Sequence, residues 1–401
     1  MRVILSAGKR GHYYLTARAL QQHGVLERFI TSTFFPRRCL RRHLVPKRYV
    51  RIRSDPGLED RRVVSLWPIE AAYRVVRPLA GRAWRRAMNA YNAAYDLASI
   101  PFLKGGTVFH FANTYGVHSA AAAKRRGMAV VLDQQSVHPG YAIDVLQAEY
   151  DRFGMWDSET DAPLVRRVLR ELELADSLLV AHRLVLEENV ARGIPAEKQR
   201  IVPFGVDTSL FRPSERTRKP KDPFRVLFAG RMSVRKGVPH MLEAVKRAAD
   251  PRIELLCAGT AAPDIESLLP RYAKHFTRLG TLSHARLAEL YREVDAFVLT
   301  SFVEGSALVT YEAMASGLPC VVTRSVGSLV EDGETGVLVP PGDPDALAAA
   351  LISLADEPER GRALGRAARA VALDNDIQLY GDRLLGAYRD FFAGSVCAAS
   401  A

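Results

Sequence analysis

Two sets of alternating strand and helix patterns, separated by a stretch rich in proline and charge, constrain this chain more than any other feature of its sequence. The first set contains short apolar runs at residues 2–6, 107–113, 128–134, 176–182 and 199–205, with helical patterns between them. Alternation of this kind predicts parallel strands joined by crossover helices. We therefore expect an α/β protein with two Rossmann-like, doubly wound domains that face each other across a cleft, where open α/β sheets bind their ligands.

The boundaries of these domains follow from a change in composition. Residues 206–223 contain three prolines, many charges and few aliphatic side chains, which is typical of a linker. The predicted division is residues 1–205, the linker 206–223, residues 224–375, and a C-terminal helix and tail at 376–401. In the second domain the predicted strands are 225–229, 253–257, 296–300, 319–323 and 336–340, and the predicted helices are 238–249, 306–316 and 345–355.

Composition limits the class of protein further. A chain of 401 residues with 48% hydrophobic and 25% charged residues is typical of a globular protein with two cores. The sequence has no run of 18 apolar residues, so no membrane span is predicted, and residues 2–6 are interpreted as a strand because no cleavage site follows them. The four cysteines lie far apart and form no Cys-x-x-Cys pair, which favours reduced thiols in a cytoplasmic protein.

The loop after the first strand of the second domain offers two cations. In "FAGRMSVRKG" (228–237), Arg231 and Lys236 follow the strand, and Gly230 gives the backbone room to turn. A guanidinium that binds bidentately and an ammonium that acts as a point charge suit a diphosphate. The alternative is a pair of ordinary solvated surface cations.

Two carboxylates flank a predicted helix start in "EGSALVTYEAMASGLP" (304–319). Gly305, Ser306 and Ala307 carry no bulky side chain over the free N–H groups, so this start is a potential anion site. Glu304 and Glu312 can each accept two hydrogen bonds from neighbouring sugar hydroxyls. Taken singly, either acid could be a surface residue or a partner of the helix dipole. As a pair they fit a nucleotide-sugar.

A third loop, which follows the strand ending at Gly280, gives a weaker indication. The backbone at residues 281–283, which include Thr281 and Leu282, lies where it could bind the edge of a base. Nothing in the composition of this loop identifies which base.

Taken together, these loops resemble a known family. The resemblance is to the donor domain of family-4 retaining glycosyltransferases, which have the GT-B fold, and it rests on "FAGRMSVRKG", "RLGTLSHARLAELYREVDAFVLTSFVEGSALVTYEAMASGLPCVVT" and "EDGETGVLVPPGDPDALAAAL". Residues 175–207 resemble the end of the acceptor domain of that family. The resemblance covers residues 107–390, and residues 12–106 lie mostly outside it. It implies that residues 1–205 bind the acceptor, residues 224–375 bind the donor, and the C-terminal helix crosses back to the first domain.

The resemblance also implies a role for each matching residue. Arg231 and Lys236 would bind the diphosphate, Glu304 the hydroxyls of the donor sugar, and Glu312 those of the ribose. Arg231, Lys236 and Glu304 would also be catalytic, because they surround the leaving diphosphate and the sugar. The remaining donor-binding candidates are Gly230, Thr281, Leu282, Gly305, the amides of Ser306 and Ala307, and Gly8 or Gly11 in the loop after the first strand of the chain.

Two departures from the family pattern stand out. The family carries a Gly-Gly-x-Pro-Glu stretch where this chain has "VVTRSVGSLVEDG" and retains only residues 326–328 of a similar kind. A histidine that serves the donor sugar in the family is replaced in "VVLDQQSVHPG", where Asp133 or Gln134 takes its place. We expect His138, a few residues later, to be the catalytic histidine, with a turn histidine before proline as the alternative. His110, within the strand 107–113, is expected to be a core residue.

No metal and no cofactor is predicted, apart from the nucleotide-diphosphate sugar that would serve as the donor substrate. The single Asp-x-Asp sequence, Asp343-Pro344-Asp345, stands at a helix start and is interpreted as a helix cap with a first-turn acid. Transfer with retention of configuration would then depend on stabilising charge on the leaving diphosphate.

The excess positive charge lies in the first quarter of the chain. The net charge is +12, yet residues 1–100 hold 20 Lys and Arg against 6 Asp and Glu, a net of +14. The clusters at 36–53 and 74–95 mix arginine with aromatic and aliphatic side chains, which favours an anionic membrane surface as partner. We therefore expect a glycan or lipid-linked acceptor, cell-surface polysaccharide or lipopolysaccharide synthesis, and a peripheral location at the inner face of the plasma membrane.

Other classes of protein remain open at this point. A solvated arginine-rich surface without a partner would carry the same charge. A nucleic-acid-binding protein would explain the charge but not the two glutamates, and no nucleic-acid partner is predicted. An inactive nucleotide-sugar-binding scaffold, or a transferase with a soluble acceptor, would retain the donor motifs.

Overall fold

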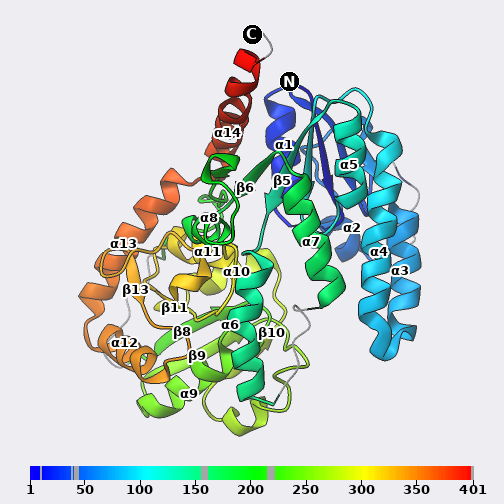
Figure 1. Cartoon of the computed structure of the whole chain (residues 1–401). Coiled ribbons are helices and arrows are strands. Elements are labelled where there is room, and N and C mark those ends of the chain that lie inside the picture. Colours follow the sequence, from blue (N-terminus) through cyan, green and yellow to red (C-terminus); the bar gives the residue numbers. More distant parts are fainter. Residues whose placement is uncertain (10, 38, 40–44, 155–160, 215–221, 399–401) are drawn as a thin grey trace.

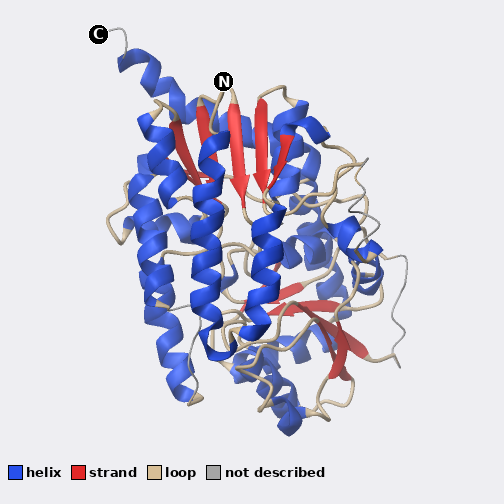
Figure 2. Cartoon of the chain, turned by 90° about the vertical axis from the view of Figure 1, so that its right-hand side faces the viewer, coloured by secondary structure: helices blue, strands red, loops and turns tan. Residues whose placement is uncertain are grey.

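The computed structural model describes residues 1–9, 11–37, 39, 45–154, 161–214 and 222–398. Its strands form two separate sheets, one in each half of the chain. Figure 2 shows the two sheets one above the other, with helices around each. Parts of two predicted features, residues 215–221 of the linker and residues 38 and 40–44 of the basic cluster 36–53, lie outside the described residues.

The N-terminal sheet has seven parallel strands in the order β3-β2-β1-β4-β5-β6-β7. Its central strands are buried because helices cover both faces, as in other parallel sheets. The five strands predicted in this half are confirmed, whereas β2 and β3 lie in the region that the sequence left unassigned. The strands are β1 (Val3–Ala7), β2 (Leu26–Thr31), β3 (Val63–Ser65), β4 (Val108–Ala112), β5 (Ala129–Gln134), β6 (Ser177–Val180) and β7 (Gln199–Ile201).

The helices of this half include a long antiparallel pair, α3 and α4, which lie side by side along the right-hand edge of Figure 1. Helix α6 instead reaches the C-terminal half (Figure 1), where Glu149 lies 2.8 Å from His240 of α9. The helices are α1 (Tyr13–Gln22), α2 (Lys47–Ile52), α3 (Trp67–Leu79), α4 (Trp84–Ser99), α5 (Val117–Arg125), α6 (Pro139–Arg152), α7 (Ala162–Leu174) and α8 (Arg183–Val190).

The C-terminal sheet has six parallel strands in the order β10-β9-β8-β11-β12-β13. Each predicted strand and helix of this half is present, within two or three residues of its expected ends. The strands are β8 (Phe224–Ala229), β9 (Ile253–Ala258), β10 (Thr277–Gly280), β11 (Ala296–Leu299), β12 (Cys320–Val322) and β13 (Gly336–Leu338). The helices are α9 (Val238–Ala248), α10 (His284–Tyr291), α11 (Leu308–Ala315), α12 (Pro344–Asp356), α13 (Pro358–Asp374) and α14 (Ile377–Ala398).

Helix α14 returns to the N-terminal sheet, where it packs against α1 (Figure 1). Buried polar contacts join them. The Tyr388 hydroxyl lies 2.6 Å from Nδ1 of His110 on β4, and the Tyr380 hydroxyl lies 3.2 Å from the hydroxyl of Thr16 on α1. His110 is fully buried, in agreement with its expected place in the core. Helix α14 therefore ties the C-terminal half to the first domain.

The contact between Tyr388 and His110 gives a prediction on stability. Tyr388→Phe leaves a buried imidazole nitrogen without its hydrogen-bond partner, so we expect it to lower the free energy of unfolding by about 1–3 kcal/mol. Urea unfolding measures this change. Gly386→Ala on the same helix is the control, because no atom lies within 4 Å of the added carbon and alanine favours a helix by up to about 1 kcal/mol. Equal stability of Tyr388→Phe and the unmodified protein would contradict the prediction.

Candidate functional site

Three loops of the C-terminal half meet at one edge of its sheet. Because the strands are parallel, the loops that follow β8, β10 and β11 all leave from the carboxyl edge, where ligands bind in this kind of sheet. These loops carry residues 230–236, 281–283 and 300–307, and thus most of the predicted donor-binding residues.

A buried ionic cluster joins two of these loops. Lys236 Nζ lies 2.6 Å and Arg235 Nη1 lies 3.0 Å from Oε1 of Glu304, and the Ser301 hydroxyl donates to the same oxygen at 3.3 Å. The side chains of Glu304 and Lys236 are only 13% and 11% exposed. The structure therefore brings the predicted Lys236 and Glu304 together, and it adds Arg235.

The protonation of Glu304 follows from this cluster. Burial by itself raises the pKa of a carboxyl group, but the adjacent Lys236 ammonium and Arg235 guanidinium outweigh burial and lower the pKa of Glu304 to about 2. Glu304 is therefore a carboxylate at neutral pH. It accepts hydrogen bonds and cannot donate one.

Glu312 lies inside α11 and has its own partners. Its Oε1 is 3.0 Å from Nε2 of His284, and its Oε2 accepts from the Tyr291 hydroxyl at 3.3 Å. Its side chain is 12% exposed, while that of His284 is 62% exposed. Glu312 is thus fixed beside the loop that carries Thr281 and Leu282, with an imidazole at the solvent side.

The segment between the two glutamates differs from its prediction. A helix was expected from residue 306, but α11 begins at Leu308, and Ala307 is its N-cap with extended backbone. The start is delayed because the Ser306 hydroxyl donates to the carbonyl oxygen of Gly327, at 2.8 Å, and lies 3.0 Å from the Tyr311 hydroxyl. The loop that departs from the family pattern, residues 324–328, therefore still packs against this turn.

The two domains meet at this turn. A β-carbon built on Gly305 would lie 2.0 Å from the carbonyl oxygen of Gln135, which follows β5 of the N-terminal sheet. Only glycine permits this approach. Gly11, with a φ of 42°, lies near the Gln135 side chain, whereas Gly8 is buried against the ring of Tyr115. Gly11 is therefore the glycine of the first loop that lies on the side of the predicted donor.

Arg231 is exposed and lines a cleft of about 1280 Å³ between the two halves of the chain. Residues of α3, α4, α6 and α7 line the same cleft on the N-terminal side. Gly230, with a φ of 146°, lies against the Lys236 side chain. Arg231 thus belongs to the cleft, while Lys236 belongs to the cluster around Glu304.

Asp133, one of the two residues that replace the family histidine, lies in a buried histidine cluster. Its Oδ2 is 2.6 Å from Nε2 of His12 and 3.6 Å from Nε2 of His110. Burial by itself raises the pKa of Asp133, but the two imidazoles outweigh it and hold the pKa well below its usual range. Nδ1 of His12 lies 3.2 Å from Nε2 of Gln135, so the cluster also positions the residue that meets Gly305.

His138 stands at the start of α6. Its Nδ1 accepts a hydrogen bond from the Gly140 amide at 3.1 Å and caps the helix. Burial and the nearby Arg192 lower its pKa, so its neutral form, which the cap requires, is favoured. The residues around it, Ser136, Val137 and Pro139, line the cleft. The cap corresponds to the turn histidine weighed as the alternative, and a catalytic role for His138 stays a prediction.

Asp343 caps α12 by accepting from the amides of Asp345 and Ala346, as expected, and Asp345 pairs with Arg247 at 2.8 Å. Within the part of the chain that the structure describes, no group of three or more His, Cys, Asp or Glu side chains is placed so that it could hold a metal ion. A search of the same residues finds no helix with the length and apolar character needed to cross a bilayer.

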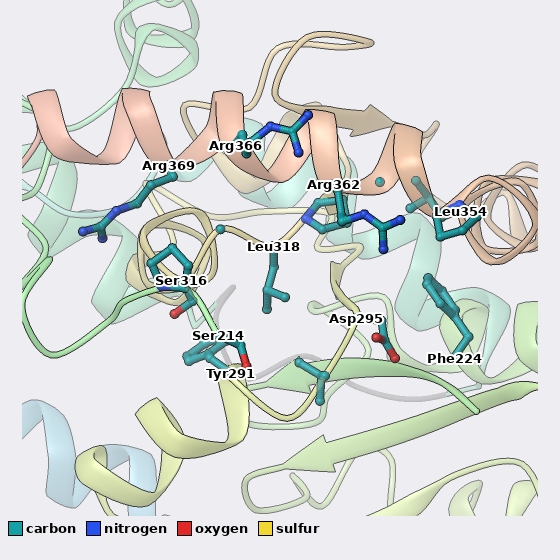
Figure 3. Close-up of a pocket in the computed structure, with 16 residues that line it drawn as sticks. Ser214, Phe224, Tyr291, Asp295, Ser316, Leu318, Leu354, Arg362, Arg366 and Arg369 are labelled. Atoms are coloured by element: carbon teal, nitrogen blue, oxygen red, sulfur yellow. The ribbon is translucent and has the colours of Figure 1, made fainter. Parts of the chain in front are cut away.

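A second cavity, of about 330 Å³, lies in the C-terminal half beside α13 (Figure 3). Arg362, Arg366 and Arg369 approach it from one helix, and Ser214 and Phe224 approach it from the other side. Its lining contains no residue of the predicted donor site, so we do not count it as part of that site.

Three residues of the site were not singled out from the sequence. Arg235 stands directly before Lys236, and its charge next to a motif cation was the signal for it. His284 lies in the loop already proposed to bind a base, at the start of α10. His12 had no such signal, because its partner Asp133 is 121 residues away in the sequence.

Comparison with known proteins defines the class of this site. Residues 223–357 match the family model described as Glycosyl transferases group 1. The fold matches crystal structures of Anabaena HepE in complex with UDP, with a TM-score of 0.65, 16% identity and coverage of 97% of this chain and 99% of that chain. It also matches sucrose-phosphate synthase from Thermosynechococcus elongatus, with a TM-score of 0.66, 22% identity and coverage of 98% and 100%. The predicted GT-B fold is confirmed.

The proteins that are similar in sequence are also glycosyltransferases. A D-inositol 3-phosphate glycosyltransferase of Segniliparus rotundus is 34% identical over 60% of this chain and 59% of its own length. A mannosyltransferase of Mycolicibacterium hassiacum is 37% identical over 45% of each chain, and a sulfoquinovosyl transferase of Arabidopsis thaliana is 32% identical over 49% of this chain and 41% of its own. The chain spans about half the length of the curated relatives it matches. Residues 223–357 therefore match the glycosyl transferases group 1 family, and the relatives are glycosyltransferases, the class that the motifs predicted.

The shifted pKa of Glu304 gives a prediction on pH dependence. A carboxyl group whose pKa falls from 4.5 to about 2 on folding contributes stability above pH 4.5, and this contribution is lost as the pH falls towards 2. Glu304→Gln removes the contribution. We therefore expect the gap in unfolding free energy between the two proteins to shrink by about 3 kcal/mol between pH 5 and pH 2, since one pKa unit is about 1.4 kcal/mol.

Urea unfolding at several pH values measures this gap. Glu334→Gln, at an exposed position, is the control, and we expect its gap to stay nearly constant. A gap for Glu304→Gln that does not change with pH would show that the two cations do not hold Glu304 as described.

Proposed function

We propose that this chain is a retaining glycosyltransferase of the hexosyltransferase type, which moves a sugar from a UDP- or GDP-sugar to a glycan or lipid-linked acceptor. The observation that carries the proposal is the buried cluster of Glu304, Lys236 and Arg235, at the carboxyl edge of the donor-half sheet and next to the loop of Gln135. The related structure of HepE with UDP-glucose supports a nucleotide-sugar donor. Synthesis of a cell-surface polysaccharide or lipopolysaccharide is the proposed setting.

The roles of the donor-site residues follow from their positions. All three described contacts of the Glu304 carboxylate reach Oε1, which leaves Oε2 to accept hydroxyl groups of the donor sugar. Glu312, held by His284 and Tyr291, would accept the ribose hydroxyls. Arg231 and Lys236 would bind the diphosphate. Gly11 and the amides of residues 306 and 307 would approach the sugar and phosphate without side chains in the way.

The chemical step needs stabilisation of the negative charge that develops on the leaving diphosphate. Lys236 now holds Glu304, and a diphosphate beside it would compete for the same ammonium. Preorganised cations in a site sheltered from water lower the barrier by interacting more strongly with the leaving group than with the bound donor. The proposed reaction therefore uses cations of this chain, and the proposal includes no metal.

Substitution of the charged donor contacts tests the proposal. Each such contact is worth about 1.5–3 kcal/mol, so we expect Glu312→Ala and Lys236→Ala each to weaken donor binding ten- to a hundredfold. Calorimetry with UDP, GDP and ADP, followed by transfer from labelled sugar donors, measures both binding and turnover. Lys274→Ala, on the surface, is the matched control. Undiminished binding and turnover in Glu312→Ala would contradict the proposed donor site. Nucleotide binding without transfer or hydrolysis would favour an inactive nucleotide-sugar-binding scaffold.

We further propose that α3 meets an anionic membrane surface. Val75, Val76 and Leu79 lie on one face of α3 and are 67%, 50% and 81% exposed. A group of neighbouring apolar side chains is rarely this exposed on a protein surface unless the surface binds a partner. The first 100 residues, which include α3, carry a net charge of +14, and each cation close to an anionic bilayer contributes about 1 kcal/mol. The neighbouring Arg77 and Pro78 line the cleft, so a lipid-linked acceptor would enter at this end.

Flotation with vesicles tests the membrane surface. We expect the protein to float with vesicles that contain anionic phospholipid and to stay behind with neutral phosphatidylcholine. The double variant Val75→Asp/Leu79→Asp should lose most of the flotation, because it places two negative charges in the interface. Leu97→Asp, at a position on α4 that is 51% exposed, is the control and should float normally. Equal flotation of both variants would contradict a role for α3.

A further inference from the structure

The lining of the cleft between the domains contains more cationic than acidic side chains. Five arginines line it, and only two acids, Glu70 and Asp264, do so. Glu70 already forms ion pairs, because Nε of Arg74 lies 2.9 Å and Nη2 of Arg53 lies 3.7 Å from its Oε1. The arginines come from both halves of the chain: Arg74, Arg77, Arg85, Arg231 and Arg235.

Arg77 is separate from the cluster of Glu304. It lies on α3 of the N-terminal half, is exposed and lines the cleft, whereas Arg231 and Arg235 line the cleft from the C-terminal half. A donor held by Glu304 and Lys236 occupies the edge of the other sheet. Arg77 is therefore placed to meet the second substrate.

The cleft also contains polar oxygens whose hydrogen bonds are incomplete. Oδ1 of Asn113, a residue 7% exposed at the end of β4, is buried without a hydrogen-bond partner among the described residues. Oδ1 of Asp264 is in the same state, although its Oδ2 accepts from the Tyr150 hydroxyl at 3.0 Å and from the Val234 amide at 3.2 Å. Buried acceptors of this kind are costly unless a donor reaches them.

Both residues line the cleft, so a small rotation of either side chain presents its oxygen to a bound hydroxyl. The backbone beside Asn113 is fixed, since Thr114 has a φ of 78° and its amide donates to the buried Glu171 at 2.6 Å. Tyr73 and Trp84 add aromatic surface to the same wall, which suits the apolar face of a sugar ring.

We propose that this cleft binds an acceptor sugar that itself carries a phosphate or carboxylate, with Arg77 holding the anion and Asn113 and Asp264 accepting sugar hydroxyls. The proposal rests on the proposed glycosyltransferase function and names the class of its second substrate. Arg85 and the exposed Arg231 add to the field that attracts an anion into the cleft.

The test uses the full chain saturated with whichever of UDP, GDP or ADP raises its melting temperature most, so that the donor site is filled. Calorimetry then compares charged probes, mannose 6-phosphate and glucuronic acid, with mannose and glucose. We expect at least one charged probe to bind at least ten times more tightly than its neutral parent. The lipid-linked arm compares vesicles that contain phosphatidylinositol with vesicles that contain the same fraction of phosphatidylserine, because α3 should attract the protein equally to both. Preference for the charged sugar or for phosphatidylinositol supports the proposal and identifies the source, and no preference in both arms overturns it.

Variants assign the residues. Arg77→Gln should weaken the charged probe at least tenfold and leave nucleotide binding unchanged, whereas Arg86→Gln, exposed on α4, should change neither. Asn113→Leu removes an unsatisfied oxygen and keeps the branching of the side chain at the γ-carbon, so it should weaken the charged and the neutral sugar alike without lowering the melting temperature. A loss of melting temperature with unchanged sugar binding would assign Asn113 a purely structural role and overturn its part of the proposal.

These outcomes separate the two proposals. A protein that binds none of the three nucleotides would contradict the glycosyltransferase function and the acceptor class with it. A protein that binds a nucleotide, but shows no preference in either the sugar arm or the lipid arm, would contradict the acceptor class alone.

Discussion

A carboxylate buried beside two cations is the constraint on which the candidate site depends. Taking a charge out of water costs several kcal/mol, so Glu304 is stable inside the protein only because Lys236 and Arg235 lie within 3.0 Å of it. The cluster fixes the loop after β8 against the loop after β11. In the proposed reaction it would also keep an acceptor for sugar hydroxyls and donors for a diphosphate next to each other before any substrate arrives. A site prepared in this way loses little energy to rearrangement when the substrate binds.

The second constraint is the close contact between the domains. Gly305 meets the carbonyl oxygen of Gln135 directly, and Asp264 accepts hydrogen bonds both from Tyr150 of α6 and from the backbone of the loop that carries Lys236. Glu149 of α6 and His240 of α9 add a buried contact of 2.8 Å. Helix α6 thus belongs to the first domain and also contacts the second. This arrangement links the two sides of the cleft.

The sequence predicted the fold of the C-terminal half well and that of the first hundred residues poorly, and the difference has a physical cause. In the C-terminal half the strands are short apolar runs bounded by glycine, and the candidate site residues follow them at once, so local pattern and candidate site coincide. Between residues 12 and 106, β2 and β3 carry charged or half-exposed residues, and α3 exposes apolar side chains, so periodicity is obscured. The helix start at residue 308 was missed because Ser306 bonds to Gly327, a contact between segments 21 residues apart.

The sequence by itself determined the α/β class and the positions of the strands in the C-terminal half, and it predicted the motif of Arg231, Lys236, Glu304 and Glu312, because each of these features lies in neighbouring residues. Only the tertiary structure decided which groups share a hydrogen bond or a cavity: Arg235 with Glu304, His12 with Asp133, and Arg77 with Asn113 and Asp264 in one cleft. Such groups are brought together by the pairing of parallel strands and the packing of two domains, which depend on contacts far apart in the chain. Local sequence patterns therefore do not predict these contacts.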